Sequence, residues 1–98
     1  MRKKRHDALV AQGAYPRLMA DRIDTAGLSR ISDVSVPVQE VLVEASPNNA
    51  AIASVGPIGH VVIELNAGAA ITIPTDDLNH LWVNLAQDDY INWIAVAI

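Results

Sequence analysis

The 98-residue sequence has no cysteine and no phenylalanine, and its four aromatic residues are two tyrosines and two tryptophans. The absence of cysteine excludes a disulfide scaffold, a thiolate zinc site and a cysteine nucleophile. No apolar run approaches the roughly 20 residues of a membrane-spanning helix, and none follows the basic N-terminus as in a secretory signal. We therefore expect one domain's worth of chain that contacts no membrane and carries no secretory leader.

Positive charge is missing from residues 31–98, which contain eight Asp and Glu side chains and no Lys or Arg. All seven basic residues lie in the first thirty positions: Arg2, Lys3, Lys4, Arg5, Arg17, Arg22 and Arg30. Self-repulsion opposes the compaction of a domain of one sign. We expect the basic segment to relieve it by contacting its own domain, a neighbouring copy or another protein. A basic tail that is simply solvated is the alternative.

Residues 1–33 predict an extended arm, because their apolar side chains follow neither a strand period nor a clean helical one. Such a segment cannot build a core of its own, but it can lie along another surface and place single apolar anchors there. The candidate partner-binding residues of the arm are Arg2, Lys3, Lys4, Arg5, Tyr15, Arg17, Leu18, Met19, Arg22, Ile23 and Arg30.

Residues 34–98 predict an all-β domain, a small antiparallel β-sandwich of jelly-roll or Ig-like type. Short apolar segments alternate with turn residues, which predicts strands near 34–44, 50–55, 60–65, 69–73, 79–85 and 90–98. A phase shift near residues 39–40 indicates a bulge, and the turn at 66–68 predicts a tight hairpin. The last strand is apolar on both faces, so it must be central in the sheet or covered by a partner.

The sequence offers little for catalysis, and we expect no enzyme, no cofactor and no metal. Its serines lack the G-x-S-x-G context of a nucleophile, and no glycine-rich phosphate loop is present. The pairs Asp76–Asp77 and Asp88–Asp89 lack the spacing of a calcium loop and are typical of soluble turns. A small cupin-like enzyme, with a metal on His60 and His80, is the competing hypothesis.

Two further features leave alternatives open. Trp82 and Trp93 fall in consecutive predicted strands, where packing in a shared core is the simpler interpretation and a platform for carbohydrate is the other. The basic run 2–5 could contact phosphates, but the acidic sheet would repel nucleic acid. We expect the arm to dock on protein, with nucleic-acid contact by the arm alone as the alternative.

The C-terminal third resembles the ending of small structural proteins of tailed bacteriophages. In these, an apolar strand ends in Ile-Pro and is followed by a loop, a Leu-x-x-aromatic-Val strand, a polar turn and a closing aromatic-Ile strand. The matching segments are Ala70-Ile71-Thr72-Ile73-Pro74, Asp77-Leu78-Asn79-His80-Leu81-Trp82-Val83 and Asp88-Asp89-Tyr90-Ile91-Asn92-Trp93-Ile94-Ala95-Val96. The sequence departs from that pattern in the last turn, where Asp88–Asp89 stands at a place often held by glycine.

The resemblance implies a structural virion protein, foremost a capsid cement (decoration) protein that bridges and stabilises coat subunits through its arm and its β domain. The expected partners are the major capsid protein or other virion subunits, and further copies of the chain in a dimer or trimer. The location implied is the virion, after synthesis in the cytoplasm of the bacterial host. A head–tail or tail component and a carbohydrate-binding β-sandwich module are the alternatives.

Overall fold

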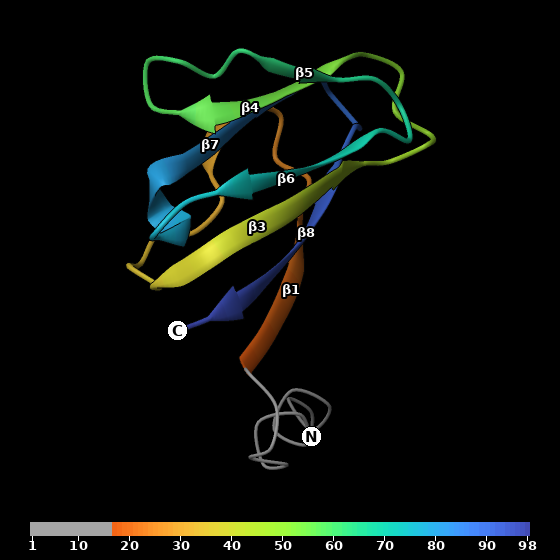
Figure 1. Ribbon diagram of the computed structural model, residues 1–98. Helices are drawn as coiled ribbons and strands as arrows, with labels where there is room; N and C mark the ends of the chain where they lie inside the picture. Colours follow the sequence, from red (N-terminus) through yellow and green to blue (C-terminus); the bar gives the residue numbers. More distant parts are fainter. Residues whose placement is uncertain (1–16) are drawn as a thin grey trace.

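The computed structural model describes residues 17–98, and nearly all its regular structure is β-strand, as the sequence predicts (Figure 1). Within this part of the chain, no helix has the length and apolar character needed to cross a membrane. The elements are β1 (Arg17–Ile23), β2 (Gly27–Arg30), β3 (Val38–Ala45), β4 (Ala53–Pro57), β5 (Ile63–Leu65), β6 (Ala70–Pro74), the 3₁₀ turn η1 (Leu78–His80), β7 (Leu81–Leu85) and β8 (Ile91–Ala97).

The strands form two antiparallel sheets of four. Sheet A has the order β1-β8-β3-β6, and sheet B has the order β2-β7-β4-β5. Figure 1 shows β4, β5 and β7 gathered at the top of the view, with β3, β8 and β1 below them. The closing strand β8 pairs with both β1 and β3. The prediction that this strand is central is therefore confirmed, and its backbone groups are paired on both sides.

The inner faces of the two sheets enclose one core. Alternate residues of β3 and β8 point inward from sheet A, and the matching positions of β4 and β7 do so from sheet B. Val41 and Val43 of β3 join Val55 of β4 and Val83 of β7 in a single buried cluster. Each such side chain contributes about 1.5–3 kcal/mol through the removal of apolar surface from water. This period-2 burial is the physical reason why the chain forms strands.

The N-terminal boundary differs from the predicted one. Residues 17–30 are not separate from the β domain, because β1 is an edge strand of sheet A and β2 an edge strand of sheet B. Met19 and Ile23, predicted to anchor on a partner, pack instead against the chain's own core. The inward positions of β1 read Met19-Asp21-Ile23, and the acid in the middle interrupts the strand pattern. Of the candidate arm residues, Arg2, Lys3, Lys4, Arg5 and Tyr15 lie outside the described residues.

Two local predictions have different outcomes. The bulge near residues 39–40 is confirmed, since the register of β3 on β8 shifts between Val38 and Val41. The tight hairpin at 66–68 is wrong, because β5 pairs with β4 in sheet B while β6 pairs with β3 in sheet A. The turn therefore carries the chain from one sheet to the other. Its Gly68, at a φ of 82°, supplies the left-handed backbone that the crossing requires.

Each acid pair contains one side chain that holds the backbone of a distant loop. Asp77 accepts hydrogen bonds from the N–H groups of Val36 (2.9 Å) and Asn79 (3.0 Å). Asp89 is buried and accepts from the N–H groups of Ala50 (2.8 Å) and Ala51 (3.0 Å). The prediction that the Asp76–Asp77 and Asp88–Asp89 pairs are only soluble turn residues is therefore wrong for one carboxylate of each pair. Their carboxylates fasten loops that connect one sheet to the other.

Candidate functional site

An apolar stripe crosses the outer face of sheet A. In the register of the sheet, Leu18 faces Val96 and Ala20 faces Ile94, while Leu42 faces Ile94 from the other side. We call Leu18, Ala20, Leu42, Ile94 and Val96 the outer stripe. The side chains of Leu18, Leu42 and Ile94 remain 36%, 40% and 39% exposed. Contiguous apolar surface of this kind marks interaction sites on soluble domains.

Polar residues border the outer stripe on one side. The next row of sheet A aligns Arg22 of β1, Asn92 of β8 and Glu44 of β3. The Arg22 guanidinium lies 4.0 Å from the centre of the Tyr90 ring, and its Nε donates to Asn92 Oδ1 over 3.3 Å. Arg22, a candidate partner-binding residue of the predicted arm, is therefore engaged within its own domain. An apolar centre with a polar rim is the usual anatomy of a protein–protein contact.

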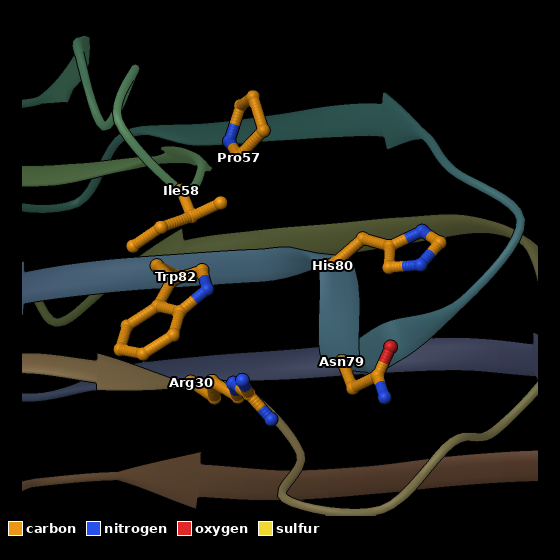
Figure 2. Close-up of a pocket in the computed structure, with 6 residues that line it drawn as sticks. All are labelled: Arg30, Pro57, Ile58, Asn79, His80 and Trp82. Carbon is orange, nitrogen blue, oxygen red and sulfur yellow. The ribbon is translucent and has the colours of Figure 1, made fainter.

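A pocket occupies the outer face of sheet B. The sheet aligns Arg30 of β2, Trp82 of β7 and Gly56 of β4 in one row. The pocket has a volume of about 460 Å³ and is lined by Arg30, Pro57, Ile58, Asn79, His80 and Trp82 (Figure 2). A pocket of this size falls in the range of small-molecule sites.

Gly56 shapes one wall of this pocket. A Cβ placed on Gly56 would lie 2.2 Å from the backbone oxygen of His60, closer than any side chain allows. Only glycine lets the 57–61 segment fold back over the end of β4, and this fold places Pro57 and Ile58 beside Trp82. Ile58 stays 60% exposed there, so the wall does not belong to the core.

Polar side chains from β2 and η1 complete the lining of the pocket. The Arg30 guanidinium is 5.1 Å from the ring centre, and no acid pairs with it among residues 17–98. Asn79 and His80 come from η1, where Asp77 caps the turn by accepting from the N–H of Asn79. His80 Nδ1 lies 2.9 Å from Asp76 Oδ1. Because an ionised carboxylate only accepts, Nδ1 is the donor, and the Nε2 of a neutral imidazole is an acceptor.

The structure places the two tryptophans in different environments and the two histidines on different elements. Trp93 is 7% exposed and packs in the core, whereas Trp82 points outward from sheet B, so the two do not share one core. His60 lies in the β4–β5 loop and His80 on η1. In the part of the chain that the structure describes, no three His, Asp or Glu side chains gather as metal ligands.

The comparisons with known proteins assign no relative to this chain: no family model matches it, and no curated protein matches it either. Function is therefore inferred from the outer stripe of sheet A and the pocket on sheet B.

The sequence contains a signal for each of these two surfaces. In Leu81-Trp82-Val83-Asn84-Leu85, the tryptophan shares its phase with Asn84 and opposes three leucine and valine side chains, which indicates an outward position. The apolar character of both faces of β8 indicates the outer stripe.

Proposed function

We propose that this chain is a structural virion protein, a capsid cement or decoration protein that binds coat subunits with the outer stripe of sheet A and its basic N-terminal segment. The outer stripe is the observation that carries the proposal. It spans three adjacent strands, its centre has no charged side chain, and nothing in residues 17–98 covers it. The proposal assigns the chain no catalytic activity.

The position of β1 supports a joint role for the outer stripe and the basic N-terminal segment. β1 begins at Arg17, whose backbone faces Ala97, and the next pair is Leu18 with Val96. The basic residues 2–5 precede this point in the sequence. The described chain therefore enters sheet A at the end of the outer stripe, and the proposal has residues 2–5 contact the same coat subunit. Apolar burial would supply affinity there, and charge would set the register.

We infer that the two sheets form a jelly roll. Only β4 and β5 are adjacent both in sequence and in a sheet, and the other six strands pair across long connections. The orders β1-β8-β3-β6 and β2-β7-β4-β5 fit two interleaved Greek keys, the arrangement found in capsid domains, lectins and cupins. This topology is compatible with a virion role, although a fold alone does not specify function.

Binding to particles tests the proposal. The purified chain is mixed with shells assembled from the coat protein of the proposed virion, and the bound fraction is measured by co-sedimentation and by electron cryo-microscopy. Leu42→Lys places a charge at the centre of the outer stripe and should abolish binding while the domain stays folded. Leu28→Lys is the matched control, since Leu28 is 51% exposed on the outer face of sheet B. Shells that bind the Leu42→Lys variant as well as the parent chain would refute the role of the stripe.

The N-terminal segment needs its own variant. Because β1 starts at Arg17, the deletion that removes the segment and keeps both sheets ends at residue 16. We expect this shortened chain to fold and to bind shells more weakly, with the loss greatest at low salt. Binding to purified tails in place of shells would favour the tail component over the cement protein.

A further inference from the structure

We propose that the pocket around Trp82 is a binding site for a neutral sugar ring. The inference goes beyond the proposed shell contact, because the pocket lies on sheet B and the outer stripe on sheet A. The core does not require Trp82, since Trp93 supplies the buried indole and Trp82 faces outward, where it is half-buried and lines the pocket.

The aromatic surface and its wall select a ligand with a flat apolar face. Trp82 provides the platform, and Ile58 and Pro57 from the β4 side limit the pocket. Figure 2 shows Ile58 and Arg30 on opposite sides of the indole. A pyranose ring has such a face, formed by its axial C–H groups, and stacking on an aromatic side chain removes that face from water.

The polar groups select hydroxyls at the edge of that ligand. The Arg30 guanidinium only donates, the Asn79 amide both donates and accepts, and the His80 Nε2 accepts when the imidazole is neutral and donates when it is protonated. Sugar hydroxyls also donate and accept, so neighbouring hydroxyls can satisfy this mixed set. Asp76 fixes the His80 ring through Nδ1, and Asp77 fixes the turn that presents Asn79. Asp77 therefore holds the η1 turn in place before a ligand arrives, whereas the His80–Asp76 pair lies at the surface, with side chains 60% and 86% exposed.

The charges at the pocket disfavour flat ligands that carry a charge of their own. Arg30 already occupies one side of the Trp82 ring, so a quaternary ammonium would meet a positive charge there. Residues 17–98 carry three arginines against ten Asp and Glu residues, and Asp76 stands beside His80 at the pocket. The net negative charge of these residues would repel a polyanionic ligand, to which Arg30 offers only one cationic contact. A neutral, amphipathic ring remains.

Titration with uncharged oligosaccharides tests the site. The full chain is titrated with maltohexaose, cellohexaose and hexa-N-acetylchitohexaose, and binding is followed by tryptophan fluorescence and by isothermal calorimetry. We expect saturable binding of at least one sugar, no calorimetric binding by Trp82→Ala, and about tenfold weaker binding by Arg30→Ala, as the loss of a charged hydrogen bond implies. Leu28→Ala, on the same face two residues from Arg30, should bind within about twofold of the parent chain.

Three results would overturn the proposal: no saturable response to any of the three sugars, full binding by the Trp82→Ala variant, or binding of adenosine in place of the sugars. Folding of each variant is checked by its thermal transition, so a loss of binding is not mistaken for a loss of structure. The Trp82→Ala variant should still bind coat shells, which separates failure of this site from failure of the shell contact.

Discussion

The carboxylate of Asp89 accepts a 2.8 Å hydrogen bond from the backbone N–H of Ala50, 39 residues earlier in the chain. The same carboxylate accepts from Ala51, and Asn49 forms two hydrogen bonds to the backbone of Tyr90. The β3–β4 loop is thereby fastened to the start of β8. These hydrogen bonds join two loops, β3–β4 and β7–β8, that each run between sheet A and sheet B.

Replacement of Asp89 should destabilise the domain. Asp89 is 4% exposed, and hydrogen bonds to a charged group contribute about 1.5–3 kcal/mol. We expect Asp89→Ala to lower the free energy of unfolding by about 2–4 kcal/mol and Asp89→Asn by less, as measured by urea denaturation. The matched control is Asp88→Asn at the exposed neighbour, which keeps a residue that tolerates the left-handed backbone and removes no carboxylate that binds the β3–β4 loop. An effect of Asp88→Asn equal to that of Asp89→Ala would contradict the role given to Asp89.

The conformation of Asp88 predicts a change in the opposite direction. Its φ of 69° lies in the left-handed region, which glycine adopts without steric cost. Asp88→Gly should keep or raise the stability by up to about 1 kcal/mol, and Asp88→Val should lower it by about 1–2 kcal/mol, because a β-branched residue is strained there. Thermal unfolding of the three proteins gives the order. A valine variant as stable as the glycine variant would show that the turn has another conformation.

Acid should weaken the fold through Asp77. The Ser35 hydroxyl and the N–H groups of Asn79 and Val36 donate to Asp77 and lower the pKa of its carboxyl below the ordinary value of 3.8, against the opposing effect of burial. A lowered folded-state pKa gives stability that is complete above the unfolded value and lost as the pH falls through the folded one. The stability advantage of the parent chain over Asp77→Asn should therefore be constant near neutral pH and shrink below about pH 4.

Ser35→Ala provides the check on this assignment. Removing the first of the three donors should raise the pKa of Asp77 toward its ordinary value, so the variant should lose part of the acid dependence. Urea denaturation at a series of pH values measures both variants. A difference between the parent chain and Asp77→Asn that persists unchanged to the lowest pH would argue against a stabilised carboxylate.

Trp93 predicts an unequal response to two substitutions. Its indole N–H is buried and has no hydrogen-bond partner among the described residues. Trp93→Phe removes this unpaired donor and leaves a modest void, so we expect a change in unfolding free energy within about 1 kcal/mol. Trp93→Ala should cost about 3–5 kcal/mol, as large aromatic-to-alanine changes in cores do. If phenylalanine were as damaging as alanine, the indole N–H would have to be engaged in the folded protein.

The strands that could be predicted from the sequence are those whose apolar and polar residues alternate. The strands from β3 onward alternate cleanly, so their existence, the bulge after Val38 and the central place of β8 could be predicted. β1 and β2 could not, because Asp21 stands at an inward position and charges crowd the segment. The sequence of a turn does not say whether it joins two strands in one sheet, so the crossing at Gly68 resembled a hairpin.

The sequence shows which residue types could form the candidate sites, but it does not show which of these residues lie together in the fold. Trp82 was a candidate platform from the start, but Arg30 joins it only because β2 pairs with β7, and Ile58 only because Gly56 permits the fold-back. These neighbours are between 24 and 52 residues from the tryptophan in the sequence, and only the sheet order brings them together. Two of the arginines assigned to a partner, Arg22 and Arg30, therefore meet aromatic rings of their own domain.

The pairing of β1 with β8 sets an order of events during synthesis. β1 is an edge strand whose neighbour in sheet A is β8, about seventy residues later in the chain. On the ribosome, β1 has no place to dock until residues 91–97 have left the exit tunnel. A fold dominated by such distant pairings forms slowly. During that interval the apolar side chains of β1 and β3 stay open to the solvent, which makes the nascent chain dependent on dilution or on chaperones until its last strand arrives.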